Sequence, residues 1–141
     1  MTEDSRDQYF ISITLDTDPA SARPLVERAL ADQGFGILTE IDVAATLKKK
    51  LDKDVPPQVI LGACNPHLAA QALEVEPAIG VLLPCNVVLR ETEAGRTLVS
   101  AIDPGTMVTF TGNAGLETIA AQARTQLSAA LHTLAEGDSH R

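Results

Sequence analysis

Two cysteines, Cys64 and Cys85, carry the side chains of this sequence best suited to chemistry. Cys64 ends a continuous apolar run, residues 59–64, which has the length of a strand buried on both faces. Asn65-Pro66 follows directly, with the residue types preferred at a helix start. Because free N–H groups and the dipole at a helix start stabilise a thiolate, we expect Cys64 to be a reactive thiol.

His67 and Cys85 extend this candidate site. His67 falls in the first turn of the same predicted helix, where its imidazole and the Cys64 sulfur could share a proton or a soft metal ion. Cys85 begins a later predicted strand, and the two sulfur atoms would meet if the two strands are neighbours. The candidate ligand-binding residues are therefore Cys64, Asn65, His67 and Cys85, and the candidate metal ligands are Cys64, His67 and Cys85. The cofactor stays unknown, with a soft metal ion as the candidate.

The same cysteines have a plainer interpretation. Free cysteine is among the most buried residue types, and both Cys64 and Cys85 follow apolar residues, so packing alone explains them. Three classes of function therefore stay open, and whether the protein is an enzyme is undecided. They are a small-ligand or soft-metal binding module, a thiol-dependent redox protein or enzyme using Cys64, and a structural or regulatory interaction protein with inert cysteines.

The elements that must position these residues follow from hydrophobic periodicity and from turn residues. We expect one α+β domain over residues 9–135, flanked by polar tails at 1–8 and 136–141. Its fold class is a mostly antiparallel sheet of about four to six strands with helices packed on one face. The predicted strands are 9–15, 37–41, 59–64, 85–92 and 96–102, and helices are predicted near 21–32, 43–51, 67–73, 78–83 and 116–134.

Composition limits the partners. The 141 residues carry a net charge of −8 and few aromatic side chains, which opposes nucleic-acid binding. The one basic cluster, Lys48–Lys50 with Lys53, is interpreted as a solvated helix face. The longest apolar stretch, residues 78–89, is too short to cross a bilayer, and the polar N-terminus predicts no secretion signal. We therefore expect a cytoplasmic protein with no membrane and no nucleic-acid partner.

Four segments carry a resemblance to a known family. They are Ile60-Leu61-Gly62-Ala63-Cys64-Asn65-Pro66-His67, Gly80-Val81-Leu82-Leu83-Pro84-Cys85-Asn86-Val87-Val88, Gly34-Phe35-Gly36-Ile37-Leu38-Thr39-Glu40-Ile41-Asp42 and Ser100-Ala101-Ile102-Asp103-Pro104. Over residues 9 to 135 the chain resembles the prokaryotic family catalogued as domain of unknown function 302. The resemblance implies a compact α+β domain that pairs as a homodimer, and it supplies no activity. The apolar segment 78–83 is a second reason to expect a homodimer, because exposed apolar patches often mark interfaces.

Overall fold

The computed structural model describes residues 9–139. In these residues, strands (β), α-helices (α) and 3-10 helices (η) alternate along the chain. The elements are β1 (Phe10–Leu15), α1 (Pro19–Asp32), β2 (Gly36–Asp42), α2 (Val43–Leu51), β3 (Gln58–Cys64), α3 (Pro66–Val75), η2 (Pro77–Leu82), β4 (Cys85–Glu93), β5 (Arg96–Ile102), α4 (Gly105–Thr111), η3 (Ala114–Leu116) and α5 (Glu117–Ser139).

The five strands form one open antiparallel sheet in the order β1-β5-β4-β3-β2. The predicted fold class is thereby confirmed. β4 and β5 form a hairpin whose turn places Gly95 at φ +79°, a backbone conformation that glycine adopts readily. β3 and β4 are neighbours in the sheet, which satisfies the condition set by the sequence for the two cysteines to meet.

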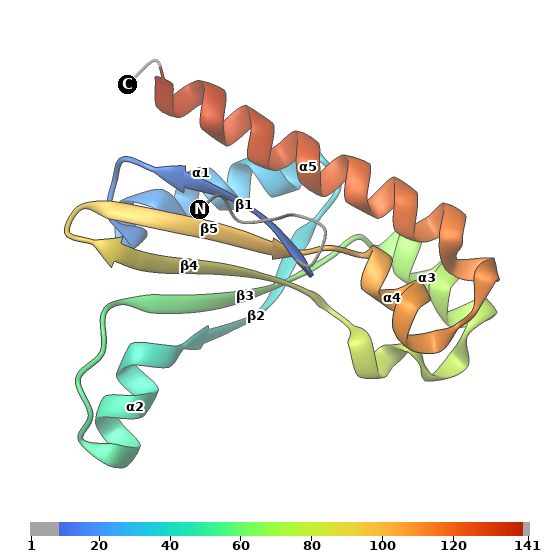
Figure 1. Cartoon of the computed structure of the whole chain (residues 1–141), viewed down its shortest axis with the longest axis horizontal. Helices are drawn as coiled ribbons and strands as arrows, with labels where there is room; N and C mark the ends of the chain where they lie inside the picture. The colour runs from blue at the N-terminus through green and yellow to red at the C-terminus, as the bar shows by residue number, and fades with distance from the viewer. Residues whose placement is uncertain (1–8, 140–141) are drawn as a thin grey trace.

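The core divides into two clusters. The first lies between one face of the sheet and the helices α1 and α5, which lie side by side over that face (Figure 1). Its largest fully buried side chains include Leu15, Leu61, Leu89 and Leu127. The second cluster lies beyond the end of β3, where Leu68, Ile79, Met107, Leu116 and Ile119 join α3, η2, α4, η3 and the start of α5. The long α5 therefore spans both clusters and ties them together.

The two ends of β3 lead to different surroundings. At its Cys64 end, α3 and α4 gather against α5, whereas at its Gln58 end α2 extends away from the rest of the molecule (Figure 1). α2 begins at the N-cap Asp42, whose carboxylate accepts a 2.8 Å hydrogen bond from the Ala45 N–H. None of its residues is buried, although its apolar residues follow helical spacing.

One helix, α4, was not predicted. Its residues Gly105–Thr111 are rich in threonine and in apolar types typical of strands. Two threonine hydroxyls instead donate to carbonyls one turn earlier, from Thr109 to Gly105 at 3.3 Å and from Thr111 to Met107 at 2.6 Å. Met107, the buried residue of α4, contributes to the second core cluster.

The last helix is longer than the sequence analysis predicted. α5 continues past residue 134 to Ser139, so residues 136–139, expected in a polar tail, are helical. The Asp138 carboxylate in its last turn accepts a 3.2 Å hydrogen bond from the N–H of Asp16, the residue that follows β1. This bond ties the helix end to the sheet. The rest of the predicted tails, residues 1–8 and 140–141, lies outside the described residues.

Candidate functional site

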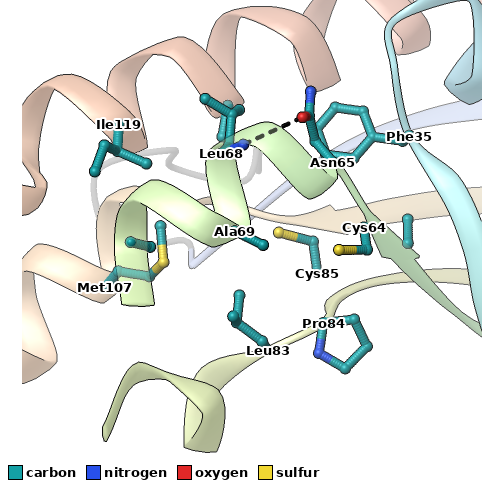
Figure 2. Close-up of a pocket in the computed structure, with 13 residues that line it drawn as sticks. Phe35, Cys64, Asn65, Leu68, Ala69, Leu83, Pro84, Cys85, Met107 and Ile119 are labelled. Carbon is teal, nitrogen blue, oxygen red and sulfur yellow. Dashed lines mark hydrogen bonds between the residues drawn. The ribbon is translucent and has the colours of Figure 1, made fainter. Parts of the chain in front are cut away.

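A small apolar pocket lies between the two core clusters and contains both cysteines. Its volume is about 30 Å³. We call it the cysteine pocket (Figure 2). Since a cavity needs only about 10–15 Å³ to hold one water, the pocket has room for one or two water-sized groups. The residues that line it are Phe35, Ala63, Cys64, Asn65, Leu68, Ala69, Ala72, Leu83, Pro84, Cys85, Met107, Ile119 and Ala123.

The meeting of Cys64 and Cys85 depends on how β3 ends. Ala63 lies opposite Cys85 in the β3–β4 ladder, so Cys64 is one register position further along. In a continuing strand, Ala63 and Cys64 would point to opposite faces of the sheet. Here Ala63, Cys64 and Asn65 all line the pocket, because the chain turns at Cys64 from β3 into α3. Figure 2 shows both sulfur atoms pointing to the same side, beneath α3.

Asn65 fixes that turn. Its Oδ1 accepts hydrogen bonds from the N–H groups of His67 at 3.1 Å and Leu68 at 3.3 Å, which caps α3 as the sequence predicted. Its Nδ2 donates to Gln126 Oε1 at 3.1 Å, which ties the start of α3 to α5. Both polar ends of the Asn65 side chain are thus used by the protein itself, and the thiols are left as the pocket's free polar groups among these lining residues.

Gly62 and Gly34 let neighbouring chain segments approach the site closely. A Cβ on Gly62 would overlap the Thr39 hydroxyl and would lie 2.8 Å from Cγ of Pro84, a pocket residue. Gly34 has φ +87°, and a Cβ there would lie 3.1 Å from Nδ2 of Asn65. Glycine at position 34 therefore meets both a backbone and a space requirement.

The two cysteines differ in their electrostatic surroundings. Burial and, to a smaller extent, a negative charge on the neighbouring Cys64 together raise the pKa of Cys85 to about 11. Both cysteines are free thiols and both are partly buried. The Cys85 thiol therefore stays protonated at neutral pH. Cys64 lies close enough for its charge to contribute to the raised pKa of Cys85.

The structure brings three of the four predicted ligand-binding residues together. Cys64, Asn65 and Cys85 line the pocket, whereas His67 is exposed and does not line it. Successive helix residues are rotated by about 100°, so Leu68 faces inward where His67 faces solvent. Across residues 9–139 no group of three or more His, Cys, Asp or Glu side chains is placed to hold a metal ion, and His67 lies outside the pocket that contains Cys64 and Cys85.

Sequence reasoning missed the lining residues that come from other elements. Met107 from α4 brings a third sulfur atom to the pocket wall, and Leu83 closes the wall from the segment before β4. The Pro84-Cys85 pair was noted in sequence, but no local pattern places α4 beside it. No helix within residues 9–139 combines the length and the apolar character needed to span a bilayer.

Comparison with known proteins agrees with this architecture. The family model described as domain of unknown function DUF302 matches residues 11–134. Among solved structures, the crystal structure of an uncharacterized conserved DUF302 protein from Bacillus stearothermophilus superimposes with a TM-score of 0.82 at 30% sequence identity. The match covers 89% of this chain and 97% of that one. No curated protein matches. The chain belongs to the family described as domain of unknown function DUF302.

Proposed function

We propose that the protein is a thiol-disulfide redox module whose working groups are Cys64 and Cys85. The observation that carries the proposal is that both thiols line one pocket from neighbouring strand ends. The other polar side chain of the pocket, Asn65, is occupied by the cap of α3 and by Gln126. A pocket of about 30 Å³ is also far smaller than the roughly 300–1,000 Å³ of pockets for larger organic ligands, so sulfur chemistry fits it better.

The reaction is an exchange with a disulfide of low-molecular-weight thiols or of another protein. The Cys64 thiolate attacks one sulfur of the incoming disulfide, forms a mixed disulfide and expels the first thiolate, which takes up a proton. The Cys85 thiol then gives up its proton and attacks Cys64 Sγ, which releases the second thiol. Two protein thiols are oxidised to one disulfide, and the incoming disulfide is reduced to two thiols. In the cytoplasmic location that we propose, the resting form is the dithiol.

Stepped ratios of reduced and oxidised glutathione, followed by alkylation and intact mass measurement, test this function. The native chain should lose both alkylation sites together and reversibly, without gaining the mass of glutathione. Cys85→Ser should accumulate a mixed disulfide on Cys64, whereas Cys64→Ser should accumulate far less on Cys85, because burial raises the pKa of that thiol. If the unfolded chain forms the internal disulfide and the native chain never does, the proposal is wrong.

A second candidate uses the same sulfur atoms to hold Cu(I). The observation that favours it is Met107, whose buried thioether lines the pocket with Cys64 and Cys85, since thiolate and thioether ligands select this soft ion. Competition with a chromophoric Cu(I) chelator should give one ion per chain. Met107→Leu, which conserves volume, should weaken binding, and Cys85→Ser should abolish it. Equal affinity in the parent and in Cys85→Ser would refute this candidate.

We also propose that the protein works as a homodimer, as the family resemblance implies. The apolar segment 78–83, which suggested an interface in the sequence analysis, offers a small surface. Ile79 is buried in the core, whereas Val81 is 85% exposed. This segment therefore offers too little apolar surface to form a subunit contact by itself.

A further inference from the structure

The mouth of the cysteine pocket is formed by the thiols and their nearest neighbours. Eight of the thirteen lining residues are buried, and the five that are partly exposed are Cys64, Ala69, Leu83, Pro84 and Cys85. The pocket therefore opens between Ala69 of α3 and the segment that leads into β4 (Figure 2). A molecule that enters from solvent meets both sulfur atoms at once.

The space beside the thiols limits the size of that molecule. The volume of the pocket is about 30 Å³. Since a group the size of one water needs about 10–15 Å³, the pocket takes a molecule of about two non-hydrogen atoms. Glutathione disulfide or a protein disulfide can present one sulfur atom at the mouth, but neither fits inside.

The wall of the pocket limits the charge of the molecule. Among the described residues that line it, none carries a carboxylate, ammonium, guanidinium or imidazole group. The amide of Asn65 is already occupied by the cap of α3 and by Gln126. Burial of a charge without a partner is costly, and the net charge of −8 on the chain also repels anions. The pocket therefore favours a neutral molecule.

We propose that the oxidising substrate of Cys64 and Cys85 is hydrogen peroxide. The inference rests on the thiol-disulfide function proposed above and names the oxidant that the pocket admits. Hydrogen peroxide is neutral, and its two oxygen atoms match the size of the pocket. Dioxygen is equally small, but it does not accept two electrons from a thiolate in one step without a metal or a radical.

The reaction balances with the two thiols alone. The Cys64 thiolate attacks one oxygen of the peroxide, the O–O bond breaks, and Cys64 becomes a sulfenic acid. The departing hydroxide takes the proton of the Cys85 thiol and leaves as water. The Cys85 thiolate then attacks Cys64 Sγ, the S–O bond breaks, and hydroxide leaves. The two sulfur atoms lose two electrons and form one disulfide, and the peroxide accepts these electrons.

The positions of the thiols suit these two roles. Both sulfur atoms point to the same side of the pocket, beneath α3 (Figure 2). Burial keeps Cys85 protonated at neutral pH, so its proton is present when the peroxide is attacked. The product is the same disulfide that the proposed exchange forms, so low-molecular-weight or protein thiols return it to the dithiol. The complete cycle passes electrons from such thiols to peroxide.

The preference between two peroxides tests the substrate. Hydrogen peroxide and tert-butyl hydroperoxide are added separately without dioxygen, and the loss of thiols is followed by alkylation and intact mass. Compared with the chain unfolded in urea, the native chain should favour hydrogen peroxide at least about tenfold, because the tert-butyl group exceeds the pocket. Leu83→Ala widens the mouth and should reduce this preference. The matched control is Leu82→Ala, since Leu82 is partly exposed but does not line the pocket.

Variants of Cys85 test the proton transfer. Cys85→Ser should leave Cys64 as a sulfenic acid that dimedone labels, whereas Cys64→Ser should show no such product. Serine keeps an O–H donor and alanine has none, so hydrogen peroxide should oxidise Cys64 several-fold faster in Cys85→Ser than in Cys85→Ala. Equal rates in these two variants would overturn the transfer of a proton from Cys85.

The outcomes separate the oxidant from the redox function. If glutathione disulfide oxidises the native pair but the peroxide preference equals that of the unfolded chain, hydrogen peroxide is wrong and thiol exchange stands. If neither oxidant forms the internal disulfide in the native chain, both proposals are wrong. A gain of one oxygen atom without loss of thiols, abolished by Met107→Leu, would place the oxidation on the Met107 thioether and overturn the inference.

Discussion

Cys64 lies one register position beyond the residue that faces Cys85 in the β3–β4 ladder, and a charge on Cys64 raises the pKa of Cys85. The larger cause of that raised pKa is burial, which disfavours the thiolate. The two thiols therefore occupy one pocket with unequal access to the reactive state. This asymmetry is useful in disulfide exchange, where one thiol attacks first and the other completes the reaction.

Cys64 should be alkylated faster than Cys85 in the native protein. With a pKa of about 11, only about one Cys85 in a thousand is a thiolate at pH 8, and the thiolate is the form that reacts. The measurement is the iodoacetamide rate at each site by mass spectrometry, with Cys64→Ser and Cys85→Ser as references. Equal or slower labelling at Cys64 would contradict a reactive thiol there.

Stability should fall in alkaline solution through Cys85. The folded chain keeps the Cys85 proton up to about pH 11, whereas a cysteine with its ordinary pKa of 9.0 loses it earlier on unfolding. The unfolded state therefore binds fewer protons between these values, and the free energy of unfolding falls by about 1.4 kcal/mol per pH unit as pH rises from 9 towards 11. Below pH 9 this stabilisation is fully present.

Urea denaturation at pH 8, 9 and 10 measures this slope. Cys85→Ala removes the titrating group, so the difference in slope between the parent and this variant isolates its contribution from all other alkaline titrations. Cys64→Ala is the matched control and should keep a fall in stability between pH 9 and 10. Parallel pH profiles for the parent and Cys85→Ala would show that the Cys85 pKa is not raised in the folded chain.

Asn65 should hold the pocket together through both ends of its amide. Asn65→Ala removes the cap of α3 and the bond to Gln126, and it should lower the free energy of unfolding by about 1–2 kcal/mol. Asn65→Asp keeps an oxygen for the cap but loses the Nδ2 donor, so it should cost less than Asn65→Ala. Gln126→Ala tests the second bond alone. If Asn65→Asp matches Asn65→Ala in a denaturation series, the cap contributes nothing.

The sequence predicted the strands and the class of sheet because these depend on local patterns, whereas the meeting of the two cysteines was expected only if β3 and β4 were neighbours. Alternating apolar residues identify the strands, and a short connection around Gly95 makes β4 and β5 partners. The start of α3 at Asn65-Pro66 was likewise readable from its residue types. What joins these elements around the pocket is long-range packing, which periodicity does not encode. Met107 is the example, since threonine-rich α4 has a strand-like composition and its place depends on contacts with α5.

Two other expectations show how helix rotation and context decide a residue's environment. His67 was expected beside Cys64, but its side chain is exposed. Successive residues of a helix are rotated by about 100°, so the next residue, Leu68, is the one that is buried. The lysines of α2 were interpreted as a solvated face of a packed helix. The helix indeed exposes them, but its apolar stripe also lacks full cover because the helix extends away from the rest of the molecule (Figure 1). An apolar stripe in the sequence indicates that one face of a helix packs against another surface, but it does not identify that surface.

Gly62 should be irreplaceable in the wall of the pocket. A Cβ at this position would overlap the Thr39 hydroxyl and stand 2.8 Å from Cγ of Pro84, closer than such contacts occur in proteins. Gly62→Ala should therefore push Pro84 outward, lower the free energy of unfolding by about 1–3 kcal/mol and increase the alkylation rate of Cys85, because the displaced ring would uncover it.

Two variants make this prediction specific. Gly36→Ala is the matched strand control, because a Cβ there would meet nothing within 4 Å, and its effect should stay within about 0.5 kcal/mol. Thr39→Ala added to Gly62→Ala removes one of the two overlaps and should restore part of the lost stability, while the contact with Pro84 stays. If Gly62→Ala is no more destabilising than Gly36→Ala, then Thr39 and Pro84 do not lie over Gly62 in solution, and the wall they form beside Cys85 is open.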